Sequence, residues 1–312
     1  MISNIAPSKI HSKSFVDIPA SKPAVRFPLM GVGVTNRPCY IQVQDPFTGE
    51  GIRLFGKVKI LFGLPADQRG VHMSRIEECL NQLPEMPLLE WMAQLSERLI
   101  TSQQLQNCEV YLDAHYTKPI TKNQSGILSE ELIELHNGIK RVGDKVEVCS
   151  GLTVPFINAC PCTQRWGMRE FYEELIAHGY EPERAEMLMH KAPLQAHTNF
   201  GKASLKIWSE HATHAQLYAV LDRAVPIVRE LLKGMDEHTL VRQAHKDGQF
   251  CEDNARAVVQ EVVNEFDSKV EDTSLIEITV DVEESVHFHN LHSQVTSQFG
   301  DLKRNLADQA AD

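Results

Sequence analysis

The sequence lacks any long apolar segment and any excess of basic residues. No run approaches the roughly 18–20 apolar residues that span a bilayer, and Ser, Lys, Asp and Pro interrupt residues 2–25, so no apolar signal-peptide core is present. A formal net charge of −11 argues against a dedicated nucleic-acid-binding protein, which usually carries a basic stripe. We therefore expect a cytoplasmic protein that binds neither membranes nor nucleic acids.

Cysteines are also few, seven in 312 residues, and this odd number is scattered along the chain. Such a distribution does not suggest the disulfide framework of a small secreted protein. The length and a hydrophobic content of 42% allow one large domain, or two ordinary ones, with a substantial core.

The hydrophobic period changes in a similar order in the two halves of the chain. In the first half, alternation predicts a strand hairpin, helical spacing predicts one helix, and alternation then returns, over residues 40–62, 88–99 and 108–112. In the second half, we predict a strand, a long helix kinked at Pro226, another helix and the clearest strand, at residues 202–207, 217–231, 258–266 and 276–282. This order favours an α+β fold of antiparallel sheets with helices on one face.

Two clusters contain residue types that bind metals. Cys160 and Cys162 flank Pro161 at the end of a strand-like run, where two buried structural cysteines are as good an explanation as a site. The spacing does not match a zinc ribbon, so a metal there needs histidine or carboxylate ligands as well. Glu284 and His287 face opposite sides of a straight strand, and they converge only if a turn or bulge interrupts it.

Other candidates have plain structural explanations when each is considered alone. His197 suits a structural role, Glu237 suits a solvated turn, and Glu252 opens a helix, where the helix dipole favours carboxylates. Residues 69–75 place Gly, His, Ser and two Arg at a helix start, which can hold an anion or form an ordinary turn.

Taken together and in order, six segments resemble the GTP cyclohydrolase type IB family. They are Arg69–Arg75 (RGVHMSR), Cys160-Pro161-Cys162, Ala196-His197, Lys233–Glu237 (KGMDE), Phe250–Asp253 (FCED) and Glu284–His289 (ESVHFH). The resemblance implies tandem tunnelling-fold (T-fold) modules in an oligomeric barrel, a homotetramer, and hydrolysis of GTP to 7,8-dihydroneopterin triphosphate and formate, the first step of folate and tetrahydropterin synthesis. We predict a polar N-terminal tail, two modules of which the second contains an inserted helical hairpin, and a polar C-terminal tail, at residues 1–26, 27–148, 149–300 (insertion 165–192) and 301–312.

The same resemblance assigns roles to individual residues. It places a divalent metal, Zn, Mn or Fe, among Cys160, His197, Glu237, Glu284 and His287, with Cys160 and His197 also acting in catalysis. It places Glu252 on the guanine base, and we take His72 and Arg75 from the first motif as further substrate contacts. The triphosphate needs basic groups, for which the candidates are Arg69, Arg75, Lys202 and Lys206. A metal lowers the pKa of bound water to about 7, which suits attack on C8 of guanine.

Two departures from the family pattern leave alternatives open. His197 is followed by Thr198-Asn199-Phe200 rather than Asn-Gln-Arg, so a basic contact is missing. The stretch from Cys162 to His197 is longer than in the short bacterial members and predicts two helices, at residues 169–178 and 182–190. A cyclic-phosphate product, as in the archaeal branch, a related pterin or deazapurine enzyme with a cysteine nucleophile, and a metal-stabilised nucleotide-binding scaffold remain as alternatives.

Overall fold

An antiparallel sheet forms the centre of the molecule. The computed structural model describes residues 17–120, 125–126, 128–192, 196–230, 233–246 and 248–309. Eight strands pair in chain order, each antiparallel to the next. They are β1 (Leu29–Gln44), β2 (Gly51–Leu64), β3 (Asn107–Ile120), β4 (Ser129–Val142), β5 (Lys145–Ala159), β6 (Thr198–Trp208), β7 (Leu275–Glu283) and β8 (Leu291–Gln298).

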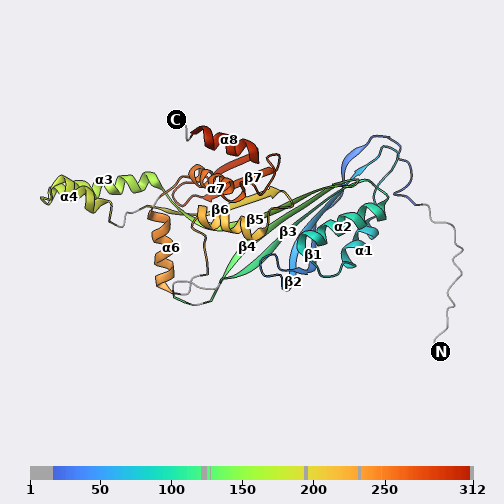
Figure 1. Ribbon diagram of the computed structural model, residues 1–312, viewed down its shortest axis with the longest axis horizontal. Helices are drawn as coiled ribbons and strands as arrows, with labels where there is room; N and C mark the ends of the chain where they lie inside the picture. The colour runs from blue at the N-terminus through green and yellow to red at the C-terminus, as the bar shows by residue number, and fades with distance from the viewer. Residues whose placement is uncertain are drawn as a thin grey trace, which may run out of the picture.

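Helices pack along the sheet in two groups, and one helix pair extends away from it (Figure 1). The helices are α1 (Met73–Asn81), α2 (Leu88–Gln103), α3 (Pro161–Ala177), α4 (Pro182–Met189), α5 (His214–Ala224), α6 (Gly234–Lys246), α7 (Cys251–Phe266) and α8 (Phe299–Gln309). The α+β class is therefore confirmed. Among the described residues, no helix has the length and apolar character to cross a bilayer.

Strict alternation on the strands divides the sheet into a core face and an open face. On β2, Val58, Ile60 and Phe62 are buried, whereas Lys57 and Lys59, which alternate with them, are exposed. The buried positions join the apolar stripe of α2 in one core cluster. Burial of such side chains contributes about 1.5–3 kcal/mol each, which is why period-two residues form a strand at this position.

The second half contains one error of prediction. We expected a helix over residues 217–231 with a kink at Pro226, but α5 ends at Ala224. The next residues run extended along β5: Ile157 donates its N–H to the Pro226 carbonyl, and Val228 donates to the Pro155 carbonyl. Proline cannot donate an N–H to a helix, so the chain turns to strand-like pairing instead. Leu231, the last residue of the expected stripe, lies outside the described residues.

Three predictions on organisation are not decided by this structure. The predicted N-terminal tail lies outside the described residues up to residue 16, as do residues 310–312 of the C-terminal tail. Residues 301–309 of the predicted C-terminal tail belong to α8, where Leu302 is buried in the core. The division into modules at residues 148 and 149 stays a prediction; the β4–β5 turn at Gly143 lies just before it. The oligomeric barrel also stays a prediction.

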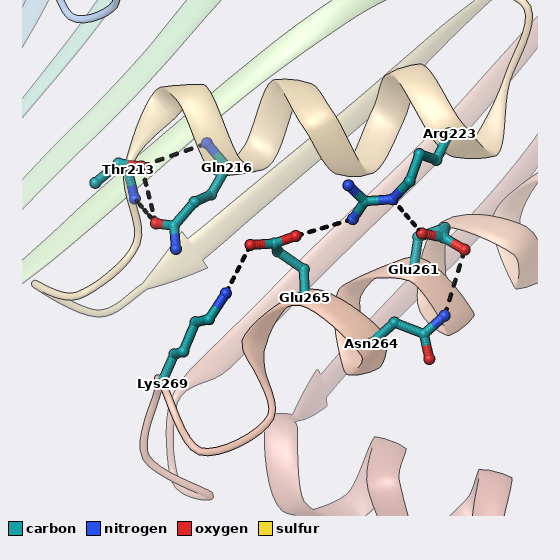
Figure 2. A network of polar contacts seen from close by, with 7 residues as sticks. All are labelled: Thr213, Gln216, Arg223, Glu261, Asn264, Glu265 and Lys269. Atoms are coloured by element: carbon teal, nitrogen blue, oxygen red, sulfur yellow. Dashed lines mark hydrogen bonds and ion pairs between the residues drawn. The ribbon is translucent and has the colours of Figure 1, made fainter.

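Polar contacts join α5 to α7 on their exposed side (Figure 2). Thr213 and Gln216 form a capping box at the start of α5. Near its end, Arg223 contacts Glu261 at 2.5 Å and Glu265 at 3.0 Å. Exposed ion pairs of this kind contribute only about 0–1 kcal/mol each to the free energy of unfolding. The burial of α5 and α7 in the core therefore matters more for stability than these pairs do.

His214, at the start of α5, is buried and predicts acid sensitivity. Its Nε2 lies 2.7 Å from Asn137 Oδ1, and burial lowers its pKa to about 4. In the unfolded chain His214 has its ordinary pKa of 6.5, whereas in the folded chain its pKa is about 4. Between these two pH values the unfolded chain binds more protons, so the free energy of unfolding is highest above pH 6.5 and falls as the pH drops toward 4. At pH 5 the expected loss is about 2 kcal/mol relative to pH 7.5.

His214→Gln should remove this component of the pH dependence, and urea unfolding at pH 7.5 and pH 5 measures it. His190→Gln, at an exposed position, is the matched control and should retain the full pH dependence. If His214→Gln loses as much stability on acidification as the unmodified chain, another group causes the loss.

Candidate functional site

Cys160 lies at the junction between β5 and α3. β5 ends at Ala159, and Pro161 occupies the first turn of α3, where the missing N–H of proline costs nothing. The Cys160 N–H donates to the His197 carbonyl at 3.2 Å and so continues the β5–β6 pairing by one rung. Cys160 is half-buried, whereas Cys162, on the first turn of the helix, is exposed.

The surroundings of Cys160 favour its thiolate. Burial of the thiol raises its pKa, but hydrogen bonds from the backbone and side chain of Thr163, from the Cys162 N–H and from the His197 side chain outweigh this effect. The pKa of Cys160 is therefore lower than that of an ordinary cysteine. A thiolate at a helix N-terminus is both a nucleophile and a metal ligand.

Asn199 brings His197 and Glu284 together. Its Nδ2 donates to Glu284 Oε1 at 2.8 Å, and its Oδ1 accepts from the Ser285 N–H at 3.0 Å and lies 3.2 Å from His197 Nδ1. His197 Nδ1 lies 4.0 Å from Glu284 Oε2. The side chain of Glu284 is 6% exposed, and its Oε2 is buried with no hydrogen-bond partner. A buried carboxylate oxygen without a donor is costly, and a bound cation removes that cost.

His245, at the end of α6, contacts the chain on both sides of His197, and no sequence motif predicts this position. Its Nδ1 lies 2.8 Å from the Val241 carbonyl, and its Nε2 lies 3.3 Å from the Ala196 carbonyl and 3.4 Å from Thr198 Oγ1. Its own carbonyl accepts a hydrogen bond from Gln164 on α3. His245 therefore joins α6 to both segments that border Cys160. The Thr198 that it contacts is one of the residues that depart from the family pattern.

The other two predicted metal ligands, Glu237 and His287, do not lie against Cys160, His197 and Glu284. Glu237 is exposed in the first turn of α6, about 12 Å along the helix from His245. β7 ends at Glu283, so the chain leaves the strand before His287, as binding of one metal by Glu284 and His287 would require. His287 is nevertheless exposed in the loop, and its ring stacks on that of His289 with the centroids 5.2 Å apart. Within the described ranges, no group of three or more His, Cys, Asp or Glu residues has the arrangement of a metal site. The five-residue metal set stays a prediction.

The predicted substrate contacts lie on other parts of the chain. His72 precedes α1, where its Nε2 lies 3.2 Å from Asp17 Oδ1, and Arg75 donates to the Ser102 carbonyl at 2.7 Å. Glu252 is exposed in the first turn of α7. α1 lies at the opposite end of the sheet from α3 (Figure 1), so one chain does not place His72 and Arg75 beside Cys160.

Comparison with known proteins identifies the family. A family model described as type I GTP cyclohydrolase folE2 matches residues 15–293. The chain belongs to this family. The prediction made from the six motifs is confirmed for GTP cyclohydrolases as a group.

Relatives within the GTP cyclohydrolases match nearly the whole chain. The GTP cyclohydrolase MptA of Methanosarcina mazei is 26% identical over 310 residues, covering 93% of this chain and 97% of its own. The MptA of Methanococcus maripaludis is 28% identical over 309 residues with the same coverages. Among solved structures, the uricase from Arthrobacter globiformis aligns with a TM-score of 0.44 at 8% identity, covering 88% of this chain and 93% of that chain.

Proposed function

We propose that this protein is a cytoplasmic GTP cyclohydrolase of type IB, built from tandem T-fold modules. It opens the imidazole ring of GTP: two waters hydrolyse the two C8–N bonds, so that C8 leaves as formate. The freed amine then condenses with the rearranged ribose carbon chain and expels one water, which gives 7,8-dihydroneopterin triphosphate. The observation that carries the proposal is the grouping of Cys160, His197 and Glu284 in a member of the GTP cyclohydrolase family, with one buried Glu284 oxygen lacking a partner.

The donor types at this site suit a divalent cation such as Zn, Mn or Fe, whereas the spacing of these described residues is not that of a metal site. A thiol with a lowered pKa, an imidazole and a partnerless buried carboxylate oxygen supply sulfur, nitrogen and oxygen donors. Cys160, His197 and Glu284 would hold the cation, with Glu237 and His287 as the remaining predicted ligands. When bound, the cation supplies Lewis-acid activation of water.

The chain's own residues hold the substrate and move its protons. The Nδ1 of His197 is directed to Asn199, so Nε2 is the ring nitrogen that remains: it carries protons to and from the guanine nitrogens when it is not a ligand of the cation. The Glu252 carboxylate accepts N1–H and the 2-amino group of guanine as a bidentate pair. His72 and Arg75 contact the substrate from a neighbouring copy, because α1 of the same chain lies at the far end of the sheet. We propose that the assembly is a homotetramer.

Incubation of the metal-loaded full chain with GTP tests the function. Formate and a pterin that fluoresces after oxidation should appear in equal amounts with at least one of Zn, Mn and Fe. Absence of formate with all three metals would overturn the proposal. A related pterin or deazapurine reaction with a cysteine nucleophile is distinguished by a chelator, because thiol chemistry alone survives metal removal.

The product needs a second measurement, because the cyclic phosphate made by the archaeal branch that the family resemblance includes remains the alternative product. Closure to a cyclic phosphate expels pyrophosphate, whereas the linear product keeps all three phosphates. We expect the linear triphosphate, and mass spectrometry with a pyrophosphate assay separates the two.

A further inference from the structure

A hollow on the open face of the sheet collects lysines. It has a volume of about 430 Å³ and lies over β1–β7, and its lysines occupy strand positions that alternate with the buried ones. Lys57 and Lys59 enter from β2, Lys140 from β4 and Lys206 from β6. Two carboxylates, Asp113 and Glu277, also line the hollow. This local excess of positive charge occurs in a chain whose net charge is −11.

The carboxylates near these lysines are engaged with other groups. Asp113 contacts His136 at 2.7 Å, Glu277 accepts from Trp208 Nε1 at 2.7 Å, and Glu109 accepts from the Tyr111 hydroxyl at 2.7 Å. Within the part of the chain that the structure describes, no ion pair within 4.0 Å joins any of the four lysines to a carboxylate. Their ammonium groups are therefore available to an anion.

Aromatic rings position two of the ammonium groups. Lys140 Nζ lies 4.1 Å from the centre of the Trp208 ring, and Lys59 Nζ lies 5.1 Å from that of Tyr111. Gly138 lies beneath both rings, and a Cβ at this position would be 3.1 Å from Trp208 and 3.3 Å from Tyr111. Glycine thus allows the rings to pack closely, and cation–π contacts hold the lysines over them.

We propose that this hollow binds an oligophosphate, either free or as part of a nucleotide. Lysine binds phosphate as a point charge, and four lysines from three strands match a ligand with several anionic groups in a row. The hollow is separate from the candidate catalytic site. Lys206 pairs with Gly151 of β5, nine residues or about 30 Å along the strand from Cys160. Lys206, which the family resemblance offered for the GTP triphosphate, thus lies away from Cys160, and the inference does not rest on the proposed function.

Titration of the full chain with sodium tripolyphosphate tests the proposal through Trp208 fluorescence. Trp166→Phe removes the exposed tryptophan of α3, and Trp91 is 2% exposed, so the signal reports on Trp208. We expect saturable binding that weakens as salt is raised and that persists in Cys160→Ala. Orthophosphate should bind more weakly, and ATP measured in parallel shows whether a nucleotide carries the preferred oligophosphate.

Lys140→Gln/Lys206→Gln should weaken tripolyphosphate binding at least about tenfold. Lys145→Gln/Lys269→Gln, which removes the same charge from two exposed lysines, should change it less than about twofold. Circular dichroism checks that both variants are folded. The proposal is wrong if the unmodified chain shows no saturable signal up to millimolar tripolyphosphate, or if both double variants weaken binding equally.

Discussion

Replacing Cys160 by alanine is expected to reduce the turnover of GTP on the order of a thousandfold, a barrier increase of about 4 kcal/mol. The reason is that Cys160 supplies the thiolate of the proposed cation site, and alanine leaves His197 and the partnerless oxygen of Glu284 without a sulfur donor. Formate release measures turnover, and elemental analysis of the purified chain measures bound metal. Both should fall together.

Cys162→Ala is the matched control for this substitution. Cys162 lies two residues further along and is exposed, so its removal should change turnover less than about threefold. A Cys160→Ala variant that keeps both metal and activity would show that the ligand assignment is wrong. Retained metal with lost turnover would instead assign Cys160 to the chemistry alone.

Replacing Glu252 by glutamine is expected to lower kcat/KM for GTP on the order of a hundredfold, because the two charge-assisted hydrogen bonds that we propose between Glu252 and guanine would be weakened or lost. ITP, whose base lacks the 2-amino group, provides an internal comparison. The unmodified chain should prefer GTP over ITP by about tenfold or more, since ITP forms only one of the two bonds. In Glu252→Gln this preference should shrink to within about threefold.

Steady-state kinetics with both nucleotides separates this role from a structural one. A general loss of folding would lower both values of kcat/KM by the same factor and leave the preference intact. An unchanged preference in a folded Glu252→Gln variant would move guanine recognition to another residue.

Much of the fold follows from local patterns in the sequence. The alternation at Ile276–Val282 predicts β7 because burial on one sheet face repeats every second residue. The stripe from Leu217 predicts the start of α5 for the equivalent reason. The predicted end of this helix, at residue 231, is wrong because residues 225–228 are still apolar but pair with β5. Apolar content alone does not distinguish a buried helix from a buried extended segment.

The site was predicted less completely, since its geometry depends on contacts between distant residues. The motifs pointed to Cys160, His197 and Glu284, which the structure brings together. In the sequence, Asn199 is only a departure from the family pattern, whereas in the structure its side chain connects His197 to Glu284. His245 lies 47 residues from the Thr198 that it contacts, and no local signal marks that pairing. Tertiary packing, rather than sequence spacing, determines both roles.

The hydrogen bond from the Cys160 N–H to the His197 carbonyl limits the effect that insertions and deletions between these two residues have on the site. The chain leaves the sheet at Cys160 and returns at His197, and this bond holds the two departure points together at the base of α3 and α4. No residue of α3 is buried. Lengthening a loop between fixed ends costs little, about 0.6 kcal/mol for each doubling. Beyond the first turn of α3, whose Cys162, Thr163 and Gln164 contact the site, this stretch can therefore change in length or accept a grafted domain near Gly179 while the spacing of the two site residues stays constant.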